Sequence, residues 1–388
     1  MTSPTLTAPS RLQTAAWATL LIFVAALQLS IAASAILLTT VLACWAANAV
    51  VARERPAVPS FFWPLVAYSA WTLVSVAFSD RPVVSLVDAK EVLLFLVVPV
   101  VFQLARGTRA TTLATVIITV GAVTAVIGIV QYGILEYDQL GQRTRGSMGH
   151  YMTYAGLLML VIGLAVARIL FAARDRAWAA LVLPALSVAL ALTLTRNAML
   201  GACVGVGLLL VLKDLRLLAA APVVAAIALA VAPAQVTERV YSTFDLQDPT
   251  NRDRLAMLRA GAGMVRDHPL TGVGPEMVER VYPRYRPADA VNDTNPHLHN
   301  VPLQIAAERG LPALALWIWF VIAVVIDLLR RFARSESRAL AAAGLAAMAS
   351  MLAAGLFEYN FGDSEFLMLL LVLVTLPAAA QSSPSAHS

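Results

Sequence analysis

Residues 311–326 have the sequence LPALALWIWFVIAVVI, and residues 217–232 have the sequence LLAAAPVVAAIALAVA, without a charged side chain in either stretch. Strands of a membrane barrel alternate in segments of about ten residues, so these continuous runs favour helices. Across the chain 60% of the residues are hydrophobic and 13% are charged, and the mean hydropathy is +0.77. Soluble domains carry about 25% charged residues. The composition therefore predicts an all-α protein whose helices satisfy their own backbone in lipid.

The chain divides into long apolar segments and one long polar segment. A spanning helix needs about 20 residues, and on this basis we expect about twelve transmembrane helices. Residues 1–233 hold the first nine, 234–310 form a large polar outer segment, 311–380 hold the last three, and 381–388 form a Ser/Ala-rich tail predicted to be disordered. The predicted spans are 13–30, 32–51, 61–78, 91–105, 111–132, 151–172, 178–194, 197–212, 217–233, 311–329, 339–357 and 366–380.

Basic residues indicate the orientation of these spans. Arg and Lys are concentrated in cytoplasmic loops of membrane proteins, and this bias accounts for much of the net charge of +5 without invoking nucleic acid. A cytoplasmic N-terminus leaves only Arg81, Lys90, Arg143, Arg145 and Arg196 in the short outer loops. Both termini are therefore predicted to be cytoplasmic, with 234–310 on the outer face. The residues assigned to the inner face are Arg11, Arg53, Arg55, Arg106, Arg109, Arg168, Arg174, Arg176, Lys213, Arg216, Arg330, Arg331, Arg334 and Arg338.

The outer segment has helical patterning and is not expected to be a flexible linker. One helix is expected over Asn251–Met264, ending near His268-Pro269. A second helical piece is expected over 275–283, ending at Pro283, and a third opens with His297-Leu298-His299-Asn300. Such amphipathic helices can lie on the bilayer surface or cap the bundle. The apolar face of the first helix is expected to be Leu255, Leu258, Ala262 and Val265.

His299 is the candidate general base of this segment. Histidine accepts and releases protons near neutral pH, because its unperturbed pKa lies there. An ordinary polar role for His297 and His299 at a helix cap is an open alternative. The two cysteines, Cys44 and Cys203, lie in apolar runs and are interpreted as small core residues.

Arginines gather on the same outer side. Arg196 interrupts two apolar spans in the sequence Thr193-Leu194-Thr195-Arg196-Asn197, where a charge usually faces a polar site; an Arg extending to the membrane surface is the alternative. Guanidinium groups suit bidentate binding of phosphate oxygens. The sequence has no Gly-rich nucleotide loop, so the expected phosphate is a lipid pyrophosphate. The other outer arginines are Arg143, Arg145, Arg252 and Arg254.

A metal site is disfavoured by the spacing of the histidines. His297 and His299 are two residues apart and would point to different faces of a helix. Asp289 and Asp293 are the carboxylates that could complete a site, but their spacing matches no known metal motif. No metal and no cofactor are therefore expected.

Several short motifs occur together in one order on the outer face. His299-Asn300 is followed by nine residues and Gly310. Ala313 stands at the last position of this motif, where the related sequences discussed below have Gly, Thr or Tyr. An Arg-x-x-x-Leu element occurs at Arg196–Leu200 and again at Arg254–Leu258. From about residue 60 to 365 the chain resembles the O-antigen ligase and polymerase superfamily of bacterial inner-membrane glycosyltransferases. The supporting runs are Arg145–His150, His268–Gly274 and Glu308–Leu311.

The resemblance implies a function and roles for the site residues. It implies a twelve-helix fold of the GT-C type, a donor glycan linked to undecaprenyl pyrophosphate, and inverting transfer without a metal, with His299 as general base. Arg196 and Arg254 are implied as pyrophosphate contacts, and Arg252 and Arg145 as further ones. His297, Asn300 and His150 are accessory candidates.

The acceptor is the point that the sequence leaves open. The first interpretation is a ligase that attaches O-antigen to a sugar hydroxyl of lipid A–core at the periplasmic face of the bacterial inner membrane. The same donor also serves an O-antigen polymerase and a protein O-oligosaccharyltransferase, which are the alternatives. A transporter of lipid-linked glycans is a more distant one, because the sequence shows neither a repeat nor paired charges within the spans.

Overall fold

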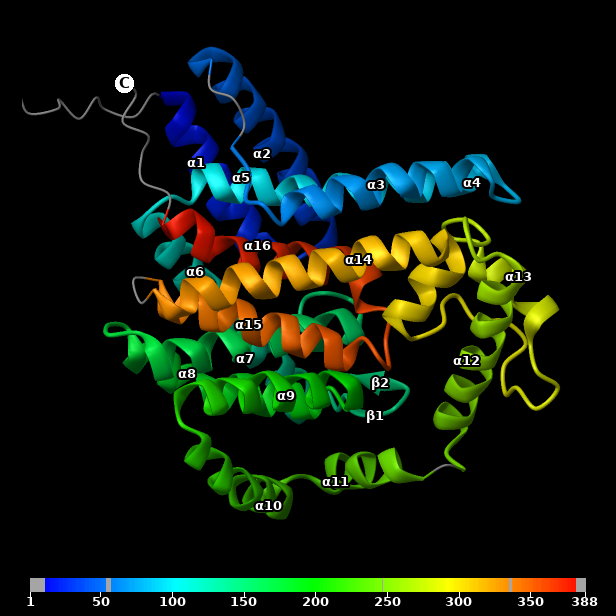
Figure 1. The fold of residues 1–388 in the computed structure, drawn as a ribbon. Helices are drawn as coiled ribbons and strands as arrows, with labels where there is room; N and C mark the ends of the chain where they lie inside the picture. The colour runs from blue at the N-terminus through cyan, green and yellow to red at the C-terminus, as the bar shows by residue number, and fades with distance from the viewer. Residues whose placement is uncertain (1–10, 54–56, 246, 335–336, 382–388) are drawn as a thin grey trace, which may run out of the picture.

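The computed structural model describes residues 11–53, 57–245, 247–334 and 337–381, and it shows a bundle of helices lying side by side (Figure 1). Before the outer segment these are α1 (Arg11–Ala26), α2 (Ile31–Ala52), α3 (Phe62–Ala77), α4 (Pro82–Asp88), the 3-10 helix η1 (Ala89–Leu96), α5 (Val97–Leu104), α6 (Thr108–Gly133), α7 (Tyr151–Phe171), α8 (Arg176–Leu192), α9 (Arg196–Lys213), the 3-10 helix η2 (Leu215–Ala220) and α10 (Ala221–Val231). The link from α6 to α7 contains a small antiparallel pair of strands, β1 (Asp138–Gln139) and β2 (Gln142–Arg143).

The outer segment and the C-terminal part are also helical. The outer segment holds α11 (Ala234–Tyr241), the 3-10 helix η3 (Ser242–Phe244), α12 (Pro249–Asp267) and α13 (Val278–Tyr285). The chain returns through α14 (Val301–Ala333), α15 (Arg338–Ala354), the 3-10 helix η4 (Asn360–Gly362) and α16 (Ser364–Gln381). The predicted disordered tail began at 381, but Gln381 ends α16; residues 382–388 lie outside the described part of the chain.

The predicted all-α membrane protein is confirmed. Six helices of the described chain, α2, α6, α7, α9, α14 and α16, are long and apolar enough to cross a membrane. Shorter apolar helices occupy Arg11–Ala26, Phe62–Ala77, Arg176–Leu192, Leu215–Val231 and Arg338–Ala354. The bundle is centred on α7 and α16, each with 83% of its apolar window buried, whereas α2 lies at the periphery with 17%.

Two of the predicted spans each consist of a 3-10 helix followed by an α-helix, and not of one continuous helix. The span 91–105 is the 3-10 helix η1 followed by α5, and Pro99 explains the change, because it lacks the N–H that would bond the carbonyl of Phe95. The span 217–233 is η2 followed by α10, which begins with Pro222 in its first turn and has no buried residue. In Figure 1, α10 and α11 lie apart from the packed helices.

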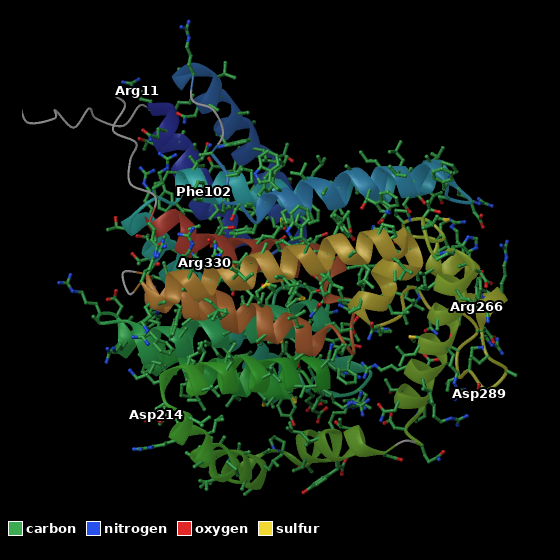
Figure 2. All side chains as sticks on the ribbon, in the orientation of Figure 1. Arg11, Phe102, Asp214, Arg266, Asp289 and Arg330 are labelled. Carbon is green, nitrogen blue, oxygen red and sulfur yellow. The ribbon has the colours of Figure 1, made fainter. Side chains whose placement is uncertain are left out.

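The two predicted faces correspond to the two ends of the bundle. Arg11 and Arg330, assigned to the inner face, lie at one end, and Arg266 and Asp289 of the outer segment lie at the other (Figure 2). The second end of the bundle carries α12, α13 and the start of α14 (Figure 1). For these four residues, the charge pattern and the fold give the same separation.

Helix α12 packs through a different face from the one predicted. Its start is capped by Asp248, whose carboxylate accepts from the N–H of Thr250 and Asn251. Leu255 and Leu258 are 50% and 41% exposed, so the expected apolar face was wrong. The buried face carries smaller residues that admit neighbours: Ala256, Met257, Ala260, Gly261 and Met264.

The outer segment has a hydrophobic core of its own. Met257 and Met264 of α12 pack with Val278 and Tyr282 of α13 and with Leu298. Helix α13 begins three residues later than predicted and contains Pro283 instead of ending there. The segment is therefore an ordered unit that closes over the end of the bundle.

Helix α14 is broken at Gly310, which adopts φ 80° and ψ 172°. Pro312 cannot donate to the carbonyl of Glu308, four residues earlier, so the regular ladder stops here. The loop after α12 supplies replacements: Val273 N–H donates to Ala307 O at 2.8 Å, and Gly274 N–H donates to Glu308 O at 2.9 Å.

Side chains of α3 also donate hydrogen bonds to the backbone at and beside this break. Trp71 Nε1 donates to the carbonyl of Arg309 at 3.0 Å, and Ser75 Oγ donates to Thr271 O at 2.5 Å. Buried backbone groups require such partners. The break therefore joins the outer segment, α3 and α14 into one unit.

We predict that Gly310→Ala destabilises the protein strongly. A Cβ at this position would lie 1.9 Å from the carbonyl oxygen of Leu270, in a left-handed backbone conformation, and that conformation alone costs about 1–3 kcal/mol for other residues. Gly207→Ala in α9 is the matched control, because its Cβ would meet open space. Thermal unfolding in detergent should show a large loss for Gly310→Ala and little change for the control; equal melting temperatures would contradict the assignment of the break.

Candidate active site

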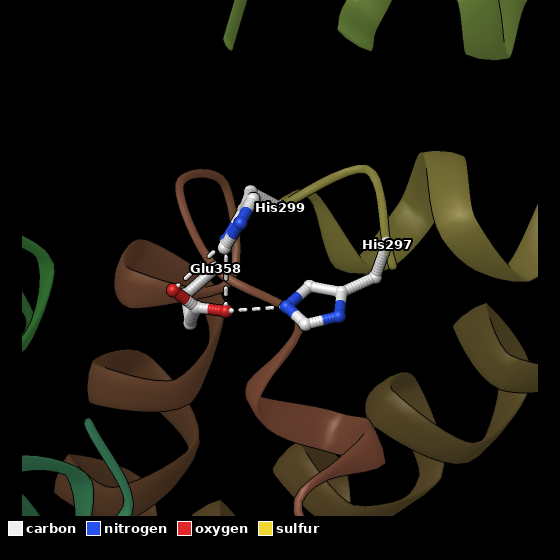
Figure 3. A group of neighbouring side chains, drawn as sticks. All are labelled: His297, His299 and Glu358. Atoms are coloured by element: carbon white, nitrogen blue, oxygen red, sulfur yellow. Dashed lines mark hydrogen bonds and ion pairs between the residues drawn. The ribbon is translucent and has the colours of Figure 1, made fainter. Parts of the chain in front are cut away.

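His299 and His297 share one carboxylate, that of Glu358 (Figure 3). Nδ1 of His299 lies 2.9 Å and 3.0 Å from the two oxygens of Glu358. Nε2 of His297 lies 3.4 Å from Oε1 of the same group, and the two imidazole centroids are 4.4 Å apart. The histidines therefore converge, although they are only two residues apart in sequence.

The start of α14 explains this convergence. The helix was expected to open at His297, but it begins at Val301, with Asn300 as the cap whose Oδ1 accepts from Leu303 N–H at 2.9 Å. His299 precedes the cap with φ 47°. The expectation that the histidines lie on different faces of a helix was therefore wrong, because both precede the helix.

The same cap connects the histidines to Glu358. Asn300 Nδ2 donates to Leu356 O at 3.1 Å, and Val301 N–H donates to Gly355 O at 2.7 Å. These bonds fix the loop after α15, which carries Glu358, against the start of α14. Asn300, predicted as an accessory site residue, is thus placed where it positions both partners.

The environment of Glu358 favours the carboxylate. Burial opposes its ionisation, but hydrogen bonds from His297 and His299 outweigh burial and hold the pKa of Glu358 well below its usual range. A carboxylate only accepts, so Nδ1 of His299 carries a proton and Nε2 is left as the basic nitrogen. This arrangement orients an imidazole as a general base does in hydrolytic triads.

Glu358 was not among the predicted site residues. It lies 59 positions from His299, so no local spacing links them. The available signal was its place in the short outer loop between the predicted spans 339–357 and 366–380.

Two cavities meet at His299. The larger has a volume of about 450 Å³ and is also lined by His150, His297 and Glu358. The second has a volume of about 330 Å³ and is also lined by Arg254. His299 and Met152 line both cavities.

Arg254 is a cation without a counter-ion at the second cavity. It forms no ion pair with any residue that the structure describes. Burial lowers the pKa of its guanidinium and the like charge of Arg239 adds to this, against the attraction of Glu358. A half-buried guanidinium without an ion-pair partner is a favourable contact for an anionic ligand.

Arg196 is placed differently from the expected pyrophosphate contact. Its Nη1 donates to the carbonyl and hydroxyl oxygens of Ser242 at 2.9 Å and 3.1 Å, and its Nη2 lies 3.7 Å from Asp248. It therefore anchors the start of α12, the helix that carries Arg254. It lines neither of the two cavities at His299.

The remaining predicted residues are divided between the site and the surface. His150 precedes α7, stacks on Tyr151 with centroids 5.2 Å apart and lines the larger cavity. Arg252 and Arg145 are exposed, and the guanidinium of Arg145 lies over the ring of Tyr137. The structure brings neither of them to the two cavities.

The donor atoms of His297, His299 and Glu358 lie within 4.8 Å of one another, a set that can hold a metal ion. The same atoms also bond each other directly as two N–H donors and one carboxylate. Asp289 and Asp293, considered as further ligands, pair instead with Arg259 and Arg286. The geometry thus allows a base or a ligand role for His299.

Comparison with protein families identifies the central part of the chain. Residues 179–318 match the family described as O-Antigen ligase. The matched segment begins within α8 and ends within α14, and it includes Arg196, Arg254 and His299. A comparison with curated proteins gives no match. The match of this multi-pass membrane protein to an O-antigen ligase domain supports its resemblance to the O-antigen ligase and polymerase superfamily.

Proposed function

We propose that the protein is an inverting, metal-independent glycosyltransferase that ligates O-antigen polysaccharide from undecaprenyl pyrophosphate to a sugar hydroxyl of lipid A–core in lipopolysaccharide biosynthesis. The observation that carries the proposal is the position of His299. Its Nδ1 bonds Glu358, and His299 lines both the second cavity, which the unpaired Arg254 also lines, and the larger cavity, which is available to another substrate.

Transfer needs one proton acceptor and one stabilised leaving group. Nε2 of His299 takes the proton of the acceptor hydroxyl while the oxygen attacks the anomeric carbon of the donor. The bond from that carbon to the pyrophosphate oxygen breaks on the opposite side, and undecaprenyl pyrophosphate leaves with the electron pair. Attack opposite to the leaving group inverts the anomeric centre.

Charged groups stabilise both changes. Arg254 balances the charge that develops on the pyrophosphate, and Glu358 stabilises the imidazolium that forms at His299. Arg196 supports the same step by holding α12, and its direct contact with pyrophosphate stays a prediction, as do those of Arg252 and Arg145. His150 and His297 border the acceptor side and serve as accessory residues.

Charge and fold together support a membrane arrangement for the proposed enzyme. We assign about twelve spans of a GT-C type fold, nine before and three after the outer segment, in the bacterial inner membrane. Both termini are cytoplasmic and the site is periplasmic. Arg11 and Arg330, assigned to the inner face, lie at one end of the bundle, and Arg266 and Asp289 of the outer segment lie at the other (Figure 2), which supports this assignment.

Deletion of the gene in its host distinguishes the ligase from the polymerase. We expect O-antigen to stay unattached on its lipid carrier, because the acceptor in this proposal is lipid A–core. Electrophoresis of lipopolysaccharide and extraction of lipid-linked glycan measure the outcome. Attachment of a single repeat unit to lipid A–core would instead assign the polymerase reaction.

We predict that His299→Ala abolishes transfer in a reconstituted assay, since a positioned general base contributes about 10²–10⁴-fold. His297→Ala should cause a smaller loss, because His297 only shares the carboxylate. Transfer by the unaltered protein should continue in EDTA. Membrane level and melting temperature of both variants serve as the folding controls.

A metal role for the same residues has the opposite pattern. If His297, His299 and Glu358 held an ion, both alanine variants would lose activity equally and EDTA would abolish transfer until a divalent ion was restored. That result would contradict the base assignment. Retained transfer by His299→Ala would do so as well.

A further inference from the structure

The larger cavity at His299 is acidic. No Lys or Arg occurs among the described residues that line it. The second cavity differs, because Arg254 lines it without an ion-pair partner and its one acidic lining residue, Asp253, accepts hydrogen bonds from Asn292. The carboxyl groups that line the larger cavity are those of Asp88, Glu91, Glu276, Glu308, Glu358 and Asp363.

Two of these carboxyl groups are fixed by the fold. Glu308 accepts from Gln304 Nε2 at 2.9 Å and pairs with Arg309 at 2.5 Å. Asp363 accepts from Thr153 Oγ1 at 2.5 Å and from Phe366 N–H at 3.0 Å. Their positions are therefore set before any ligand binds.

Other carboxyl groups of the cavity are unused by the protein. The side-chain oxygens of Glu91 and Glu276 accept no hydrogen bond from the described residues. Burial raises the pKa of the Glu276 and Asp363 carboxyls. A carboxylate accepts from a hydroxyl and a protonated carboxyl also donates to one, so both forms bind a hydroxyl-rich ligand.

An unpartnered amide oxygen lies at the same cavity. Asn360 lines it and is only 7% exposed, yet its Oδ1 has no hydrogen-bond partner, while its Nδ2 donates to Met351 O. A buried acceptor without a donor is costly. A ligand that supplies O–H or N–H groups would satisfy it.

These features separate two ligand chemistries on the two sides of His299. An anion is attracted by Arg254, whereas each carboxyl group of the larger cavity that is ionised repels it. A hydroxyl or an ammonium group is favoured in the larger cavity, because carboxyl groups accept hydrogen bonds from both. Its volume of about 450 Å³ lies within the range of small-molecule sites.

We propose that the acidic cavity is the acceptor subsite, and that it selects a terminal sugar that is uncharged or carries an amine. It excludes a sugar that bears a phosphate beside the reacting hydroxyl. The proposal rests on the proposed function, with the donor pyrophosphate on the Arg254 side of His299. Glu276 has a specific part in it, because it lines the cavity, is exposed, and its carboxyl forms no ion pair with the described residues.

Two forms of one acceptor test the selection. Lipid A–core whose terminal sugar has been dephosphorylated is compared with the same material phosphorylated on that sugar, using purified lipid-linked O-antigen as donor and the full-length protein in liposomes. We expect kcat/KM for the phosphorylated form to be lower by about tenfold or more, from repulsion by the cavity. Glu276→Lys should narrow this difference and leave the KM for donor unchanged. Glu276→Gln, which keeps the shape, should narrow it less.

Glu279→Lys is the matched control, because Glu279 is exposed nearby and does not line the cavity. It should keep the discrimination of the unaltered protein. Equal use of both acceptors, or an equal effect of the substitutions at 276 and 279, would overturn the acceptor subsite while leaving the glycosyltransferase intact. Absence of transfer to either acceptor by the unaltered protein would overturn the proposed function itself, and with it the subsite.

Discussion

The break of α14 at Gly310 is the constraint on which the site depends. An unbroken helix would bond its own carbonyls and leave the loop after α12 without an attachment. With Gly310 outside the helical region, the carbonyls of Ala307 and Glu308 bind Val273 and Gly274 of that loop. The outer segment is thereby fixed above the bundle. The break also turns the first part of α14 so that its capped start meets the loop after α15.

The position of His299 as a base depends on the contact between the start of α14 and the loop after α15. The loop after α15 supplies Glu358, whose carboxylate fixes the protonated nitrogen of His299. The outer segment supplies Arg254, which lines one of the two cavities at His299, and carboxyl groups line the other cavity. A base between a cationic and an acidic surface is suited to a reaction with an anionic leaving group and a neutral hydroxyl.

Composition and periodicity predicted the helices well because long apolar segments have few alternatives in lipid. Motif order also singled out His299, Arg254 and Gly310 from sequence. Side-chain partners were harder, since Glu358 and His299 are brought together by the bonds of Asn300 and Val301 to the loop after α15. The buried face of α12 was mistaken because Leu255 and Leu258 have the apolar spacing of a core face, whereas the packing uses Ala260 and Gly261. Arg196 matched a motif, yet its bonds to Ser242 depend on a turn that no local pattern specifies.

The division of ligands at His299 is tested most directly by a cryo-electron microscopy structure of the protein bound to undecaprenyl pyrophosphate. The account predicts diphosphate density against Arg254, on the side of the cavity that His299 shares with Met152 and Asn292, with the carboxyl-lined cavity free of phosphate. Diphosphate density among Glu276, Asp363 and Asn360 would contradict it, because the donor would then occupy the side assigned to the acceptor.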